Sequence, residues 1–171
     1  KNTEEERLLG VSLTGIMDNE LTNGKKHGLE KTLEALREIA VETNKEWSAI
    51  FGIPQSTAIT CVKPSGTVSQ LVDSSSGIHP RHSSYYIRTV RGDNKDPLTN
   101  FMKDSGIPSE ADFMKPDTQT VFSFPMKSPK KSVVRNDMTA IEQLEMWLLY
   151  QRHWCEPVSY THLRAHETIA N

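Results

Sequence analysis

Two short apolar runs flank one long amphipathic stretch, and this arrangement constrains the fold more than any other feature of the sequence. Apolar residues recur close to the helical period from Leu29 to Phe51, and the pattern ends at Gly52. The apolar run from Leu8 to Ile16 precedes this helix, and the β-branched run from Thr57 to Val62 follows it. Strand, helix and strand in this order predict a parallel βαβ crossover in an α/β fold, because parallel neighbours need such a connection.

The loop after the second strand has the composition of an anion-binding turn. It begins at Lys63-Pro64-Ser65-Gly66 and continues through Thr67-Val68-Ser69, where a short helix can start. Backbone N–H groups at such a turn point outward, and Ser and Thr hydroxyls add further donors. Gly66 lets a ligand approach the backbone closely. The loop also lies at the carboxyl end of a strand, where ligands of α/β folds bind. An ordinary turn without a ligand is the alternative, and the sequence is not a Walker A loop.

The charge around this loop favours an anionic ligand. The whole chain has a formal net charge of -2, whereas the window from Ile59 to Arg91 is basic. We take Lys63, Arg88 and Arg91 as candidates for neutralising an anion there. The stretch from Ile78 to His82 is expected to be a solvated or anion-contacting loop rather than half of a metal site, since no third ligand has a clear spacing.

Further elements are predicted downstream. Tyr85 to Arg91 and Thr118 to Phe124 indicate strands, the second ended by Pro125, and Pro97 to Ile107 indicates a short helix. Thr139-Ala140-Ile141-Glu142 is a capping-box signature that opens a final helix. The residues expected on the buried face of that helix are Ile141, Leu144, Leu148 and Trp154.

Composition narrows the class of protein. The apolar runs are short and the first residues lack the pattern of a signal peptide, so we expect a cytoplasmic protein without membrane contact. Cys61 and Cys155 are far apart, which argues against a disulfide scaffold or a Cys-x-x-Cys site. The basic stretch from Lys127 to Lys131 lacks interleaved aromatic residues, so no direct nucleic-acid contact is expected.

Three stretches together resemble one enzyme family. They are GVSLTGIMD (10–18), KPSGTVSQL (63–71) with SGIHPRHSSYYIRTVR (76–91), and RNDMTAIEQLEMWLLYQRHWCE (135–156). In this order they are similar to the late catalytic-barrel region of the adenosylcobalamin-dependent (class II) ribonucleoside-triphosphate reductases. The resemblance runs from Leu8 to Glu156.

The resemblance implies a fold and a reaction. The fold would be part of a ten-stranded α/β barrel over residues 1–156. In the reaction, homolysis of the cobalt–carbon bond of adenosylcobalamin leads to a cysteine thiyl radical that abstracts the ribose 3′ hydrogen, and the 2′ hydroxyl leaves as water. A cysteine pair, re-reduced by a thioredoxin-like partner, supplies the electrons. The resemblance places the substrate phosphates on Ser65, Gly66, Thr67, Val68 and Ser69.

Several family features are absent from this sequence. It has no Asn-x-Cys-x-Glu loop for the thiyl radical and no C-terminal cysteine pair, so neither Cys61 nor Cys155 receives a catalytic role. We therefore expect a fragment without turnover of its own and a cobalamin site largely outside it. Residues 157–171 resemble translated sequencing adapter and are predicted to be a non-native tail.

Two alternatives stay open at this point. One is a reductase of another class, with its radical from a metal subunit or a glycyl radical. The other is a non-catalytic module that binds nucleotide phosphates.

Overall fold

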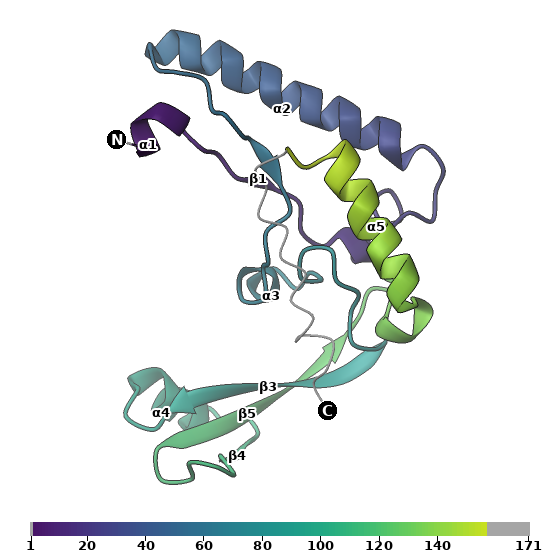
Figure 1. The fold of residues 1–171 in the computed structure, drawn as a ribbon. Helices are drawn as coiled ribbons and strands as arrows, with labels where there is room; N and C mark the ends of the chain where they lie inside the picture. The colour runs from purple at the N-terminus through teal and green to yellow at the C-terminus, as the bar shows by residue number, and fades with distance from the viewer. Residues whose placement is uncertain (1, 157–171) are drawn as a thin grey trace. The chain divides into compact units, whose positions relative to one another are not determined.

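The computed structural model describes residues 2–156, so the predicted tail at 157–171 lies outside the described residues. The chain divides into two compact units, one made of residues 1–81 with 130 onward and the other of residues 82–129. We call them the helical unit and the sheet unit. No shift of composition marks their boundaries in the sequence. Helices and strands together give an α/β chain (Figure 1).

The helical unit holds most of the helices. Its elements in chain order are α1 (Asn2–Glu6), β1 (Val11–Ser12), the 3-10 turn η1 (Ile16–Asp18), α2 (Leu29–Phe51), β2 (Thr60–Cys61), α3 (Val68–Leu71), the 3-10 turn η2 (Arg135–Asp137) and α5 (Ala140–His153).

The predicted βαβ unit is confirmed. β1 and β2 pair in parallel, with Val11 opposite Thr60, and α2 forms the connection between them. Both strands are shorter than predicted. The expectation of a strand from Leu8 to Ile16 is wrong at its carboxyl end, where Gly15 takes a left-handed conformation (φ 70°) and starts η1.

The second edge of β2 is contacted by the residues that directly follow α5. The Glu156 carboxylate accepts hydrogen bonds from the amides of Ile59 and Thr60, and the Glu156 amide donates to the Thr60 carbonyl (3.2 Å). The Thr60 hydroxyl donates to the carbonyl of Trp154 (2.6 Å). These bonds attach residues 154–156 to β2 on the side opposite β1.

Helix α2 matches its predicted bounds. Its end follows from Gly52, which adopts φ 64° and donates its N–H to the last helical carbonyls, as a left-handed C-terminal cap does. The amide of the next residue, Ile53, returns to the Ser48 carbonyl (3.0 Å).

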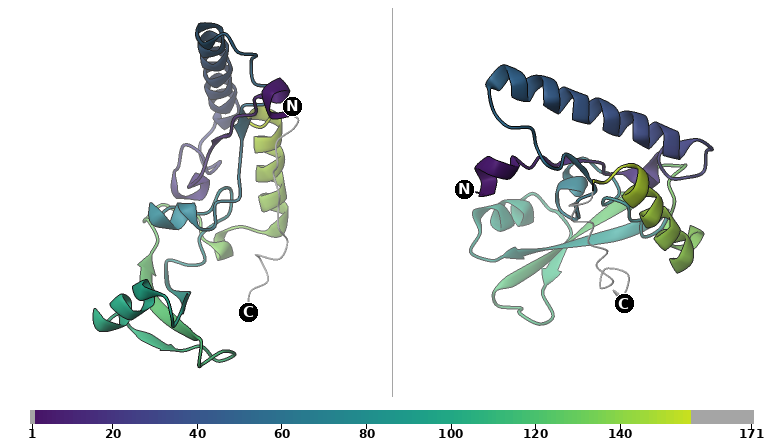
Figure 2. Two further views of the ribbon diagram at one scale, coloured as in Figure 1. Left: turned by 90° about the vertical axis from the view of Figure 1, so that its left-hand side faces the viewer. Right: turned by 45° about the horizontal axis from the view of Figure 1, so that its top comes forward.

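One hydrophobic core lies between α2, α5 and the loops beside them. Its residues are Ile16, Met17, Leu29, Leu33, Val62, Ile78, Val133, Met146, Tyr150, Trp154 and Cys155. The first turns of α2 pack against α5, as both views in Figure 2 show, and Glu34 contacts His153 at their junction (2.7 Å). Tyr150 is fully buried and donates its hydroxyl to the Thr22 carbonyl (2.8 Å), and burial raises its pKa.

The predicted buried face of α5 is partly wrong. Trp154 is buried as expected, but Ile141, Leu144 and Leu148 are exposed. The helix instead buries Met146 and Tyr150, which lie on the stripe that continues to Trp154 at i, i+4 and i+8. Apolar residues occupy two faces of this helix, and only one of them meets the core of this chain.

The sheet unit is a three-stranded antiparallel sheet with one helix. Its elements are β3 (Tyr85–Asp93), α4 (Pro97–Asp104), β4 (Ser109–Ala111) and β5 (Gln119–Lys127), with strand order β3-β5-β4. Both predicted strands and the predicted helix are present, but the helix ends at Asp104 rather than at Ile107. Gly92 on β3 permits the close approach of α4, because an added Cβ would lie 2.3 Å from the Thr99 hydroxyl oxygen.

Strand β5 does not end at Pro125, contrary to the prediction. It continues to Lys127, with Pro125 opposite Ile87 of β3. The Ser123 amide donates to the Pro108 carbonyl on the β4 side, so alternation puts the nitrogen of Pro125 on the β4 side too. The β4 register covers only Thr120 to Phe122, so no ladder bond needs the missing N–H.

Within residues 2–156, no helix is both long enough and apolar enough to cross a membrane.

Candidate functional site

The loop from Lys63 to Ser69 directly follows β2 and leads into α3, as the sequence predicted. It therefore lies at the carboxyl end of a strand in a parallel pair. Lys63, Gly66, Thr67 and Val68 are exposed, Ser65 is half-buried, and Ser69 is buried. We call the exposed residues Gly66, Thr67 and Val68 the outer part of the loop, and Ser65 with Ser69 its inner part.

The inner part is held by the serine side chains. The Ser65 hydroxyl forms a hydrogen bond with the Thr14 hydroxyl (2.6 Å) and accepts one from the Gly77 amide (2.9 Å). The Ser69 amide (3.0 Å) and the Ser69 hydroxyl both donate to the Ser65 carbonyl. The hydroxyls of Ser65 and Ser69, the Ser65 carbonyl and the Ser69 amide therefore form hydrogen bonds within the chain, and these bonds fix the loop.

The outer part has open space above it. A Cβ added to Gly66 would meet no atom within 4 Å, and Gly66 does not adopt a left-handed conformation. Neither packing against other described residues nor backbone strain requires glycine at this position. Among residues 2–156, no side chain covers the exposed surface over Gly66.

Lys63 is the charged group on the same loop. Its amide donates to the Ser12 hydroxyl (2.9 Å), which ties the loop to β1. Its side chain lies over Gly10, where an added Cβ would be 2.4 Å from Nζ. Burial raises the pKa of the nearby Cys61 thiol, and the charge of Lys63 only partly opposes this. Cys61 therefore lacks the lowered pKa of a reactive thiolate.

Arg88 and Arg91 belong to the sheet unit, whereas the loop and Lys63 belong to the helical unit. Arg91 forms an ion pair with the buried carboxylate of Asp112 (2.6 Å). Its hydrogen bond is the main cause that lowers the pKa of Asp112, helped by the amides of Met114 and Lys115. The charge of Arg91 is thus balanced inside the sheet unit.

Sequence reasoning missed the role of Arg81. The expectation of a solvated loop from Ile78 to His82 is wrong for Ile78 and Arg81, which are both buried. Arg81 forms ion pairs with Asp18 (2.9 Å) and Asp73 (2.8 Å). Asp18 lies 63 residues before Arg81, and no local pattern indicates a pairing over that distance.

Among the described residues, no group of three or more His, Cys, Asp and Glu side chains could hold a metal ion.

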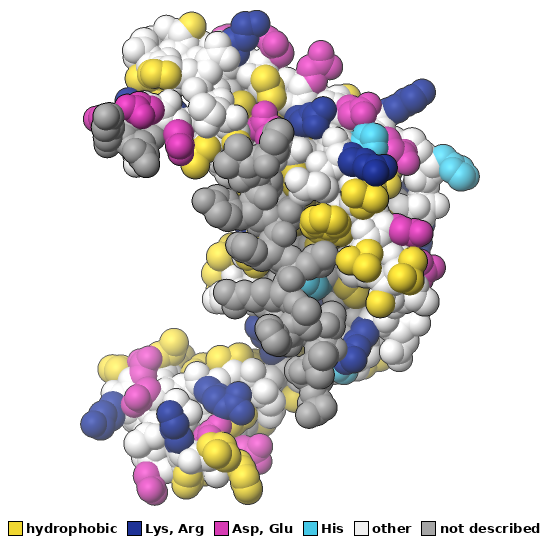
Figure 3. Space-filling view, in the orientation of Figure 1, with side chains coloured by type: hydrophobic (Ala, Val, Ile, Leu, Met, Phe, Trp, Pro, Cys, Tyr) yellow, Lys and Arg dark blue, Asp and Glu magenta, His cyan; other side chains and the backbone are white. Residues whose placement is uncertain are grey.

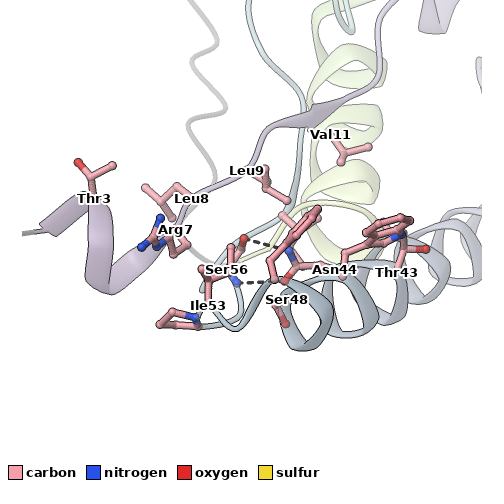
Figure 4. A pocket seen from close by; sticks show the side chains of 15 residues that line it. Thr3, Arg7, Leu8, Leu9, Val11, Thr43, Asn44, Ser48, Ile53 and Ser56 are labelled. Carbon is pink, nitrogen blue, oxygen red and sulfur yellow. Dashed lines mark hydrogen bonds between the residues drawn. The ribbon is translucent and has the colours of Figure 1, made fainter.

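A separate apolar cavity lies at the other end of the βαβ unit. It has a volume of about 610 Å³ and lies between the segment before β1, the second half of α2 and the connection to β2 (Figure 4). Leu8, Leu9, Trp47 and Phe51 line it, and Asn44 holds the connection through hydrogen bonds to Ser56 (3.0 and 3.2 Å). Its lining is mainly hydrophobic, which is typical of a packing surface rather than of a site for acid–base chemistry.

Comparison with known proteins gives a consistent result. No family model matches the chain. The chain is 31% identical over 150 residues to the adenosylcobalamin-dependent ribonucleoside-triphosphate reductase of Euglena gracilis, a match that covers 88% of this chain and 20% of that protein. The enzyme of the same name from Lactobacillus gasseri is 28% identical over 184 residues, covering 91% of this chain and 25% of that protein.

A solved structure agrees with these sequence matches. A crystal structure of a B12-dependent (class II) ribonucleotide reductase superposes with a TM-score of 0.76 at 25% identity. The superposition covers 92% of this chain and 26% of that one. The chain thus spans about a fifth to a quarter of the length of the relatives that it matches.

Proposed function

This chain is similar in sequence and in fold to one part of the adenosylcobalamin-dependent (class II) ribonucleoside-triphosphate reductases, and from that similarity we propose that it is a segment of such an enzyme. Residues 1–156 form the reductase segment in this proposal, and residues 157–171 are left out of it as a non-native tail.

The intact protein is then a cytoplasmic oxidoreductase that converts ribonucleoside triphosphates to 2′-deoxyribonucleoside triphosphates, with electrons from a thioredoxin-like partner. Adenosylcobalamin supplies the radical that starts the chemistry. Reductase activity of the intact protein in the absence of cobalamin would contradict this assignment and favour a reductase of another class.

We place the cobalamin site largely outside this segment. Neither Cys61 nor Cys155 stands in an Asn-x-Cys-x-Glu pattern, so we assign the radical-bearing thiol to another part of the enzyme. No step of the reaction is assigned to these residues. We expect the segment to be inactive when it is separated from the remainder of the enzyme.

The βαβ unit supports a place in the wall of a ten-stranded α/β barrel. Parallel strands joined by a helix are the repeating element of such barrels, and β1, α2 and β2 form one such element. The contact of Glu156 with the outer edge of β2 brings the chain back beside the strand after α5, where a further strand would continue the sheet.

Within this segment, we assign the substrate phosphates to the loop Ser65, Gly66, Thr67, Val68 and Ser69. The observation that carries the assignment is the open, exposed surface over Gly66 at the carboxyl end of β2. The backbone of Gly66 to Val68 and the Thr67 hydroxyl would contact the phosphates, while Ser65 and Ser69 hold the loop. Lys63, on the same loop, is our first candidate for neutralising their charge, and Arg88 and Arg91 of the sheet unit are the other two candidates.

Gly66→Val in the intact enzyme tests the loop. The substitution places two methyl groups where phosphates would approach, so we expect nucleotide affinity to fall by about tenfold or more. Thermal stability should change by less than about 0.5 kcal/mol, since nothing within 4 Å of an added Cβ is displaced. Isothermal titration with a ribonucleoside triphosphate measures the affinity.

Thr89→Val is the matched control. It introduces the same valine side chain at an exposed position of β3, outside the loop, and should leave the affinity unchanged. Unaltered nucleotide affinity in Gly66→Val would remove the loop from the phosphate site.

A further inference from the structure

Arg81 is the most completely enclosed charged group beside the loop. Its side chain is 2% exposed, yet it carries a full positive charge and forms ion pairs with two acidic residues, Asp18 and Asp73. Nε and one terminal nitrogen donate to both carboxylate oxygens of Asp18 (3.0 and 2.9 Å). The guanidinium also donates to the carboxylate (2.8 Å) and to the backbone carbonyl of Asp73.

A chain of hydrogen bonds connects Asp18 to Ser65 through the backbone of Ser75 and the Thr14 hydroxyl. The Asp18 carboxylate accepts a hydrogen bond from the Ser75 amide (2.7 Å). The Ser75 carbonyl in turn accepts from the Thr14 hydroxyl (3.2 Å), which bonds directly to the Ser65 hydroxyl. The Gly77 amide donates to both hydroxyls of this pair (3.0 and 2.9 Å).

The Asp73 arm reaches the same loop from its other end. Asp73 follows α3 and has a left-handed backbone (φ 46°), a conformation that few residues other than glycine adopt. The next amide, that of Ser74, donates to the Ser69 carbonyl (2.9 Å), and Ser69 donates back to Ser65. The guanidinium contacts with Asp73 therefore hold the end of α3 in place.

The charges around Arg81 indicate whether its guanidinium could attract a phosphate directly. One guanidinium faces two carboxylates, so the three side chains together carry a net charge of about -1 near neutral pH. Such a group does not attract phosphates. Arg81 can therefore affect a bound ligand only indirectly, by fixing the position of the loop from Ser65 to Ser69.

We propose that Arg81 is a positioning residue for nucleotide phosphates, setting the place of the loop Ser65 to Ser69 through Asp18 at one end and Asp73 at the other. The proposal rests on the phosphate-binding role assigned to that loop above. Lysine cannot replace arginine here, because a single ammonium group cannot reproduce the planar fork that bonds both carboxylates at once.

The test is Arg81→Lys in the full-length reductase that contains this chain. We expect the KM for the ribonucleoside triphosphate to rise by about tenfold while kcat falls by less than about threefold. Hydrogen exchange at the Ser75 and Gly77 amides should accelerate in the same variant, because both amides are held by groups that Arg81 orients. Asp73→Asn, which preserves the size of the side chain and its backbone carbonyl, should show the same pattern more weakly.

Asn44→Ala supplies the structural control. It removes hydrogen bonds that fix the connection to β2 at the far end of the unit, so it should lower the melting temperature without changing KM. A variant of Arg81 that merely folds less well would behave like this control.

Three outcomes separate the possibilities. A raised KM with faster exchange at Ser75 and Gly77 supports the positioning role. An unchanged KM, or unchanged exchange, in both Arg81→Lys and Asp73→Asn overturns it. If the wild-type enzyme neither binds nor reduces a ribonucleoside triphosphate, the proposed function fails as well, whereas exchange still reports on the Arg81 network alone.

Discussion

At the scale of single residues, acidic partners determine which cations are available to a ligand. The window around the loop counts as basic in sequence, but Arg81 is paired with Asp18 and Asp73, and Arg91 is paired with Asp112. Asp18, Asp73 and Asp112 are 63, 8 and 21 residues away from the arginines that they contact, so no helical or strand periodicity indicates these pairs. The sequence could predict where cations are, and it could not predict which of them are already neutralised.

The Arg91–Asp112 pair predicts a dependence of the sheet unit on pH. The folded-state pKa of Asp112 lies below its usual value of about 4, so the pair stabilises the fold above that pH. The stabilisation is lost as the pH falls below about 4 and through the lowered pKa. In Asp112→Asn, we expect lower protection factors for the Met114 and Lys115 amides at neutral pH, and a smaller further loss of protection on acidification than in the wild type.

Hydrogen exchange of the intact protein between neutral pH and pH 3 measures this. Asp117→Asn changes an exposed carboxyl of the same loop and should follow the wild type. Equal acid sensitivity of wild type and Asp112→Asn would contradict the prediction.

At the scale of helices and strands, local signals were predicted better than contacts between elements. The bounds of α2 follow from its periodicity and from Gly52, and the capping box of α5 is present as expected. The buried face of α5 was not predictable, because that helix carries a second apolar stripe and the sequence does not say which stripe meets α2. The antiparallel pairing of β3 with β5 joins residues 26 to 42 positions apart, from Asp93–Gln119 to Tyr85–Lys127, and such pairing has no local signature.

The capping box gives a prediction at this scale. The Thr139 hydroxyl accepts from the Glu142 amide (3.3 Å), and the Glu142 carboxylate accepts from the Thr139 amide (2.7 Å), which lowers the pKa of Glu142. Thr139→Ala removes the capping side chain and should destabilise the protein by about 1 kcal/mol. Urea unfolding followed by far-UV circular dichroism measures the change.

Thr139→Ser retains a capping hydroxyl and is the control, with an expected change of less than about 0.5 kcal/mol. A loss of equal size in both variants would mean that the methyl group of Thr139, rather than its cap, supplies the stability.

At the scale of the whole molecule, many large hydrophobic side chains lie on the surface instead of in the core. Hydrophobic side chains appear on the surface of both units in the space-filling view (Figure 3). On α2, the exposed large residues are Leu36, Ile39, Trp47, Ile50 and Phe51. A segment that spans about a fifth of its relatives is expected to present such faces, since the remaining chain would pack against them.

The apolar cavity turns this into a prediction. Residues 1–156 produced alone should self-associate through these faces, and the association should weaken when the chain is extended by its upstream coding sequence. Trp47 lines the cavity and is half exposed, so its fluorescence should shift to shorter wavelength in the extended protein. Sedimentation velocity and tryptophan emission measure the two effects, with Trp47→Phe identifying the signal. A monomeric segment whose Trp47 emission does not change on extension would contradict the prediction.

Pro125 has a consequence for how the sheet unit meets other chains. Beyond the three residues that pair with β4, the outer edge of β5 continues with a proline where a donor would otherwise face outward. A strand from another chain that paired with this edge would lack one inter-strand hydrogen bond and would have to bend around the pyrrolidine ring of Pro125. Replacing this imino acid would therefore restore a donor on this edge of β5 and open the edge to intermolecular β-augmentation.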